Sequence, residues 1–225
     1  GGDALSGTGP NAGGPHYLHA RQKRPQPRGS GALSVSASAP APLFDQQLRR
    51  AASAFDDWTA SANRRDVLVR AAANARDEAA DVFRLAVSLY AEHFEQSVEL
   101  PGPTGESNTL RLKGRGAVLC LGGGTEAANR RQIALALSAG NAVIATAPLA
   151  EMIARALGQA GAPDHLVIGL PAGASVNEGA LIDPRVRAAV FDGAIDARKA
   201  IASVLSRRTG PIAPLLSSAD GPARF

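Results

Sequence analysis

The chain has 225 residues, of which 45% are apolar and 4% aromatic, with 24 basic and 20 acidic side chains. This length holds one domain of ordinary size with extensions, and the apolar fraction excludes an intrinsically disordered chain. A single cysteine excludes a disulfide scaffold and indicates a reducing compartment. The basic excess of four charges does not require a nucleic-acid partner, and no apolar run reaches the roughly 20 residues that cross a bilayer.

The N-terminal part of the chain has the composition of a loop and a linker. Residues 1–20, "GGDALSGTGPNAGGPHYLHA", are rich in glycine and predict a tightly folded loop. No methionine precedes them, so we expect the sequence to begin inside a longer chain. Residues 21–43 contain proline, serine and glycine after a basic start and lack a hydrophobic period, which predicts a linker.

Residues 44–97 carry a helical pattern. Apolar residues recur at steps of three and four along two successive stretches, so each stretch is predicted to be an amphipathic helix with one buried face. Trp58 lies on the first apolar stripe and is expected to be a core residue. The two stripes consist of Leu48, Ala52, Phe55, Trp58 and Ala62, and of Leu68, Ala72, Ala75, Ala79, Val82, Ala86 and Tyr90.

Residues 98–225 alternate between apolar, strand-like runs and helical patterns. Such alternation is typical of βαβ units, and strands that are apolar throughout are expected where helices cover both faces of a parallel sheet. The predicted fold class is therefore α/β, a Rossmann-like sheet preceded by two amphipathic helices. After a short strand at Thr109–Leu112, the predicted strands are Ala117–Leu121, Ala142–Thr146, Leu166–Leu170, Arg187–Phe191 and Ile212–Leu216.

A glycine-rich turn follows the first strand of this sheet. "GGGTEA" places Gly122, Gly124 and Ala127 in a G-x-G-x-x-A pattern at a helix start, where backbone amides can bind a pyrophosphate. Two features oppose that role. The second strand ends in "ATAPLAE", with no acid to bind a ribose hydroxyl, and Glu126 would repel a phosphate from the first helical turn. A tight structural turn is favoured, and a working nucleotide-binding domain is the alternative.

The chain shows no constellation typical of catalysis or of a metal site. Cys120 stands between two leucines inside a predicted strand, so we expect a buried, inert thiol. The histidines, His16, His19, His93 and His165, are scattered without the spacing of a metal site or a triad. No catalytic residue and no metal ligand is therefore predicted.

A further alternative is an anion-binding or nucleic-acid-binding module. It would use the basic "RQKRPQPR" stretch of the linker together with Arg130, Arg131, Arg207 and Arg208. No aromatic residue accompanies the basic stretch to stack on bases, so a solvated linker is favoured.

Several stretches resemble a known family. "GGDALSGTGPNAGGPHYL" resembles the glycine-rich end of the dehydrogenase module in proline utilization A, the bifunctional bacterial enzymes that oxidise proline to glutamate. "GPTGESNTLRLKGRGAVLCLGGG" is similar to a stretch in the C-terminal part of the longer members. "FDDWTASANRRDVLVRAAANARDEAADVF" and "ALSAGNAVIATAPLAEMIARALGQAGAPDHLVIGLPAG" are similar to aldehyde dehydrogenase segments, and the longer members carry an extra domain of that kind.

This resemblance implies a division of the chain into four parts. Residues 1–20 would be the tail of the dehydrogenase module and residues 21–43 the linker. Residues 44–97 would be the helical pair, and residues 98–225 a Rossmann-like domain that is truncated at its C-terminus.

The departures from the family pattern lie at the cofactor-binding positions. Relatives place a lysine for the adenosine ribose where this sequence has Thr146, and an uncharged threonine cannot replace an ammonium donor. Relatives read F-T-G-S-x-x-x-G where this sequence reads "FDGAIDAR", which puts Asp192, Ala194 and Arg198 at the phosphate positions. The resemblance thus implies a degenerate site that binds no cofactor.

The resemblance also implies a role. The segment would be a non-catalytic structural domain that packs on the dehydrogenase module of the same chain and helps to enclose the channel between two active sites. The parent would use FAD for proline oxidation and NAD for oxidation of L-glutamate gamma-semialdehyde. It would form a homo-oligomer in the cytoplasm, peripheral to the inner membrane, and would not contact nucleic acid through this segment.

Overall fold

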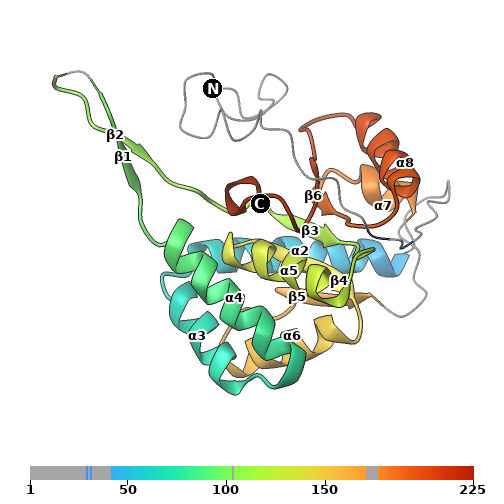
Figure 1. Cartoon of the computed structure of the whole chain (residues 1–225), viewed down its shortest axis with the longest axis horizontal. Coiled ribbons are helices and arrows are strands. Elements are labelled where there is room, and N and C mark those ends of the chain that lie inside the picture. Colours follow the sequence, from blue (N-terminus) through green and yellow to red (C-terminus); the bar gives the residue numbers. More distant parts are fainter. Residues whose placement is uncertain (1–28, 30, 32–41, 103, 171–176) are drawn as a thin grey trace.

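The computed structural model describes residues 29, 31, 42–102, 104–170 and 177–225. The expected glycine-rich tail at residues 1–20 and almost all of the expected linker at residues 21–43 lie outside them. Within the described part, the predicted α/β class is confirmed: N-terminal helices precede a parallel five-stranded sheet (Figure 1). None of the helices in this part is long and apolar enough to span a bilayer.

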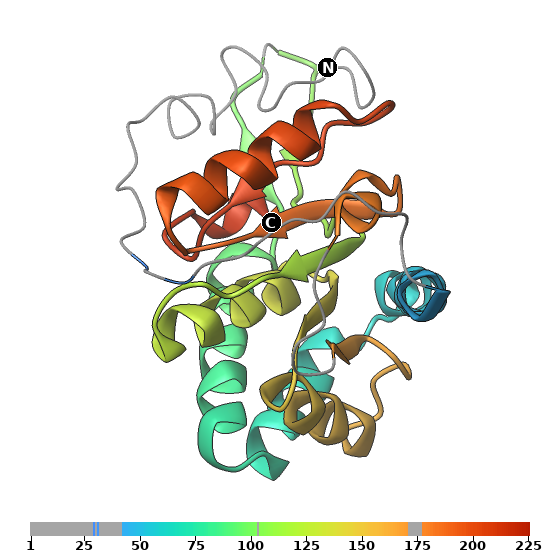
Figure 2. The same ribbon diagram turned by 90° about the vertical axis from the view of Figure 1, so that its right-hand side faces the viewer.

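The sheet has the strand order β5-β4-β3-β6-β7, with every pair parallel. β3, which comes first along the chain among the strands of this sheet, lies in the centre, so the order reverses between β3 and β6. Helices lie on both sides of the strands (Figure 2), which explains why nearly all strand residues are apolar; the exceptions are Arg187 in β6 and Thr146 at the end of β4. The strands are β3 (Ala117–Cys120), β4 (Ala142–Thr146), β5 (Val167–Leu170), β6 (Val186–Val190) and β7 (Leu215–Leu216).

Three helices precede the sheet where the sequence predicts two. They are α2 (Pro42–Ala60), α3 (Arg64–Asn74) and α4 (Asp77–His93). The predicted second helix is broken at Ala75 and Arg76, whose ψ angles of 152° and 164° are extended. The break lets α3 and α4 pack against each other. Neither proline nor glycine marks it, and the apolar stripe continues across it, so periodicity alone predicts one helix.

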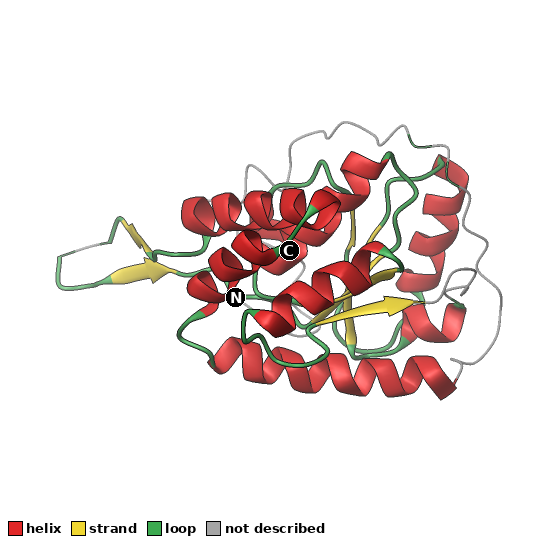
Figure 3. Cartoon of the chain, turned by 90° about the horizontal axis from the view of Figure 1, so that it is seen from below, coloured by secondary structure: helices red, strands yellow, loops and turns green. Residues whose placement is uncertain are grey.

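The helices form layers around the sheet (Figure 3). Helix α2 contacts β3, β4 and β5, and Trp58 at its C-terminal end is 1% exposed, which confirms its predicted core position. Helices α3 and α4 pack on α5 and α6 rather than on the strands. The helices that follow α4 are α5 (Glu126–Ser138), α6 (Leu149–Gln159), α7 (Glu178–Ile182), α8 (Ile195–Ser206) and the 3₁₀ turn η1 (Pro222–Arg224).

A two-stranded antiparallel hairpin projects from this body (Figure 1). It pairs β1 (Val98–Leu100) with β2 (Asn108–Leu110). The sequence predicts a strand at Thr109–Leu112, close to β2, but not its partner β1. The prolines after β1 weaken the strand pattern in the sequence, and β1 pairs with residues 8 to 12 positions further along the chain.

Candidate functional site

Ligands of open α/β sheets bind outside the carboxyl ends of the strands, at the point where the strand order reverses. In this chain that point lies between β3 and β6. It is formed by residues 121–125, which follow β3, and residues 191–194, which follow β6. We call these two loops the switch-point edge. The predicted phosphate turn and two of the predicted degenerate positions, Asp192 and Ala194, lie in or next to it.

The turn after β3 contains two glycines with left-handed backbone angles, Gly122 and Gly123, and several amides at this turn are bonded within the chain. Gly122 has a φ of 69°, a left-handed value that favours glycine. The amide of Gly124 donates to Asn129 Oδ1 at 3.3 Å, and Thr125 caps α5 by accepting from the amide of Ala128 at 3.2 Å. Two of the donors that could bind an anion are therefore satisfied by side chains of the turn and of α5. Ala127 lies in the first turn of the same helix.

The side chain of Gln132 in α5 links the two loops of the switch-point edge by hydrogen bonds. The sequence does not predict this role. Its side chain is fully buried, and it bonds both backbone groups of Gly122: the amide donates to Oε1 and Nε2 donates to the carbonyl, each at 3.0 Å. Nε2 also donates to Asp192 Oδ2 at 2.6 Å. A polar side chain within the buried run of α5 is the one signal that could have identified it.

Asp192 is buried, with 3% of its surface exposed. Besides the bond from Gln132, its carboxylate accepts from the amide of Ser218, at 3.0 and 3.1 Å from the two oxygens. Its own amide donates to the carbonyl of Gly122 at 2.9 Å. Through its side chain and its amide together, Asp192 thus joins α5, the turn after β3 and the loop after β7. Hydrogen bonds offset the cost of burying a carboxylate, and the group already has its partners.

The remaining predicted positions have different surroundings. Thr146 ends β4 and is exposed. Ala194 precedes α8 as its N-cap residue and offers no side-chain cap. Arg198 of α8 donates to backbone carbonyls of the sheet, at 2.6 Å to Phe191 and 3.1 Å to Leu216. Its guanidinium is therefore bonded to the ends of β6 and β7.

Cys120 is buried in β3, as the sequence predicts. Burial, and next the charge of Asp192, raise the pKa of this thiol far above its usual range, so it stays protonated at neutral pH. His93 and His165 lie at the end of α4 and just before β5, while His16 and His19 lie outside the described residues. No group of three or more metal-ligating side chains occurs in the part of the chain that the structure describes.

The four arginines of the anion-binding alternative each have a partner within the chain. Arg130 lies 3.5 Å from Glu78, and Arg207 lies 2.8 Å from Glu178. The other two donate to backbone carbonyls, Arg131 to Ser218 at 2.8 Å and Arg208 to Val186 at 2.8 Å.

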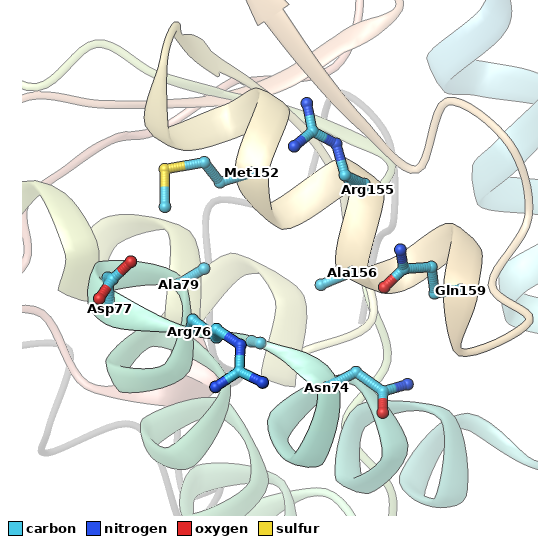
Figure 4. A pocket seen from close by; sticks show the side chains of 9 residues that line it. Asn74, Arg76, Asp77, Ala79, Met152, Arg155, Ala156 and Gln159 are labelled. Atoms are coloured by element: carbon cyan, nitrogen blue, oxygen red, sulfur yellow. The ribbon is translucent and has the colours of Figure 1, made fainter.

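A groove of about 240 Å³ lies away from the switch-point edge, between the α3–α4 turn and α6. Its floor contains alanines and Met152, and exposed polar side chains surround it (Figure 4). They include Arg76 and Arg155, whose guanidiniums point in different directions (Figure 4). The lining contains no nucleophile with a neighbouring base, so we assign this groove no chemistry. The polar lining residues are Asn74, Arg76, Asp77, Arg155 and Gln159.

Comparison with known proteins relates this chain to one group of bacterial proteins. No family model matches it. It is 34% identical over 128 residues to the bifunctional protein PutA of Klebsiella aerogenes, a match that covers 54% of this chain and 8% of that protein. It is 32% identical over 150 residues to the bifunctional protein PutA of Escherichia coli strain K12, covering 64% of this chain and 10% of that one. The matched region thus spans about a tenth of the length of these relatives.

Solved structures of proline utilization A and of aldehyde dehydrogenases are also similar to this chain, and they describe its fold. A proline utilization A structure from Bradyrhizobium japonicum matches with a TM-score of 0.61 and 25% identity, over 79% of this chain and 22% of that one. An aldehyde dehydrogenase from Bacillus cereus matches with a TM-score of 0.61 and 15% identity, over 76% of this chain and 42% of that one. The chain is therefore a relative of the bacterial proline utilization A proteins that corresponds to a segment of their length and has an aldehyde dehydrogenase-like fold.

Proposed function

We propose that this chain acts as a non-catalytic, aldehyde dehydrogenase-like domain of a bifunctional enzyme that oxidises proline to glutamate. The parent would use FAD in its proline dehydrogenase step and NAD in its L-glutamate gamma-semialdehyde dehydrogenase step. One observation carries the proposal for this segment. The side chains of Gln132 and Asp192 bond to each other and already accept from the amides of Gly122 and Ser218, two donors that an anion at or beside the switch-point edge could otherwise use.

The energetic argument compares the bonds that exist with those that a dinucleotide would make. Leaving a buried polar group without its partner costs about 1–3 kcal/mol, and a pyrophosphate at this edge would displace several such bonds. Binding at about 1 μM amounts to roughly 8 kcal/mol, so these losses would offset much of it. The uncharged Thr146 supplies no ammonium in return. The free energy lost by breaking these bonds therefore disfavours nucleotide binding at the switch-point edge.

The domain would then pack on another part of the parent enzyme and help to enclose the channel between its two active sites. Its partner would be the dehydrogenase module of the same chain, within a homo-oligomer in the cytoplasm. The similarity to two bifunctional PutA proteins supports this assignment, and the aldehyde dehydrogenase-like fold is consistent with it.

Calorimetric titration with NAD tests the proposal. We expect no saturable heat up to millimolar concentrations, with an NAD-binding aldehyde dehydrogenase as the positive control for the nucleotide. A dissociation constant in the micromolar range would contradict the proposal.

A working nucleotide site is the second candidate, and the left-handed glycines of the turn after β3 favour it. Substitution of Gly124 would not separate the two candidates. A Cβ there would lie 2.9 Å from the Cβ atoms of Ala128 and Asp192, so the turn itself would be disturbed. Titration of the unaltered chain is therefore the decisive test.

A further inference from the structure

Two glycines of the N-terminal region lie on the switch-point edge. The amide of Gly29 donates to the carbonyl of Asp192 at 3.1 Å, and the amide of Gly31 donates to the carbonyl of Gly123 at 3.2 Å. The carbonyl of Gly31 accepts from the amide of Ala194 at 3.1 Å. Gly31 thus bonds both loops, the one after β3 and the one after β6, through its backbone alone.

This contact admits no side chain on either partner. A Cβ on Gly31 would lie 2.7 Å from the Cα of Gly123, and a Cβ on Gly29 would overlap the carbonyl oxygens of Asp192 and Gly123. On the other partner, a Cβ on Gly193 would overlap the carbonyl oxygen of Gly31. Contacts this short do not occur between real Cβ atoms and backbone, so glycine at these positions is what lets the two backbones approach.

The bonds also use a group that a dinucleotide would require. Ala194 is the N-cap residue of α8, so its amide lies where the helix start would meet a phosphate. That amide is already bonded to Gly31. The carbonyls of Asp192 and Gly123 accept from Gly29 and Gly31, so the two glycines lie against both loops.

From these contacts we infer that the switch-point edge is a docking site for the chain's own backbone, and that Gly29 and Gly31 are its ligand. The site binds these two glycines through main-chain hydrogen bonds in place of a nucleotide. This deepens the proposed function, because it assigns a use to an edge that is proposed to hold no cofactor. It also fixes Gly29 and Gly31 to the loops after β3 and β6.

Hydrogen exchange of single amides in the 225-residue chain, followed by NMR, tests the docking. We expect the amides of Gly29, Gly31 and Ala194 to be protected in the unaltered chain. The double variant Gly29→Ala, Gly31→Ala should accelerate exchange at all three by about tenfold or more, because the added methyl groups displace the segment. The matched control is Gly158→Ala with Gly221→Ala, where a Cβ meets nothing within 4 Å. That control should leave the three rates unchanged.

Protection of the β4 amides verifies that each variant is folded. If Gly29 and Gly31 exchange freely in the unaltered chain, or if the double variant leaves their exchange unchanged, the docking inference is wrong.

A parallel titration with NAD separates this inference from the proposed function. Protected glycine amides with no NAD binding in either protein support both. Nucleotide binding that appears only in the double variant also supports both, because the unaltered chain then stays closed to NAD through the docked glycines. Nucleotide binding to the unaltered chain overturns the proposed function. Unprotected glycine amides without nucleotide binding overturn the docking site alone.

Discussion

At the scale of single residues, the pair Gln132 and Asp192 sets the chemistry of the switch-point edge. The sequence singles out Asp192 as a position that departs from the family pattern, and it predicts a charge placed against phosphate. In the structure the carboxylate is buried and bonded to Gln132 and Ser218. The bond to Gln132 joins residues 60 positions apart. No local pattern encodes such a contact, so the sequence could not reveal the partner.

The Gln132 bonds can be tested by Gln132→Ala. The substitution leaves Gly122 and Asp192 without their partners in a buried site, so we expect the free energy of unfolding to fall by about 3 kcal/mol. Urea unfolding measures this change. Gln159→Ala, at an exposed position on α6, is the control and should change stability by less than about 0.5 kcal/mol. Equal effects at the two positions would show that the buried network does not stabilise the fold.

Cys120 gives a second test at this scale. Its thiol is buried and its pKa is raised, so we expect almost no reaction with a thiol reagent such as Ellman's reagent in the native protein at pH 8. Full reaction should follow on unfolding in urea. Rapid modification of the native chain would contradict the buried position of this side chain.

At the scale of elements, side chains fix the helices to one another through backbone carbonyls. Arg70 of α3 donates from Nε and Nη2 to the carbonyl of Ala160, at 3.1 and 2.9 Å, where α6 ends. Carbonyls at a helix C-terminus lack intrahelical partners, and a cation there also interacts favourably with the helix dipole. One side chain thus links the outer helix layer to the layer on the sheet.

Arg70→Ala should therefore lower the free energy of unfolding by about 1–2 kcal/mol, since a charge-assisted hydrogen bond is lost at a partly buried site. Arg84→Ala removes an exposed pair with Asp81 within one helix and should cost at most about 0.5 kcal/mol. Thermal unfolding of both variants measures the two losses in the free energy of unfolding. Similar costs for both would indicate that the α3–α6 contact adds nothing beyond a surface ion pair.

A second element-scale contact joins the start of α2 to β6 and depends on pH. Arg185 bonds Asp45 and Asp183, each at 2.6 Å, and its guanidinium holds the pKa of both carboxyls below their usual range. A lowered folded-state pKa gives stability that is complete above the unfolded-state value of about 3.9. That stability is lost as the pH falls through the folded-state pKa.

We therefore expect stability to fall as the pH drops below about 4, and Arg185→Ala to make this fall shallower. Urea unfolding between pH 3 and pH 7 measures both slopes. Lys199→Ala removes an exposed pair with Asp196 and should leave the slope unchanged. If Arg185→Ala and the unaltered chain show parallel slopes, the network does not contribute to the pH dependence.

At the scale of the whole molecule, the sequence predicts the layered α/β fold well and the contacts at its carboxyl edge poorly. Strands β3, β4, β5 and β6 are almost entirely apolar and return at regular spacing, so composition and period suffice to place them. The break between α3 and α4 and the partner of β2 depend on tertiary packing, which a single sequence does not display. The docking of Gly29 and Gly31 likewise involves glycines about 90 and 160 residues from the loops that they contact.

A crystal of the chain soaked with NAD tests the central claim most directly. The account predicts an unchanged switch-point edge, with Gln132 bonded to Asp192 and the backbone of Gly29 and Gly31 still seated on the loops after β3 and β6. Electron density for the adenosine and its phosphates beside Thr146 and Ala194, with those bonds broken, would contradict it.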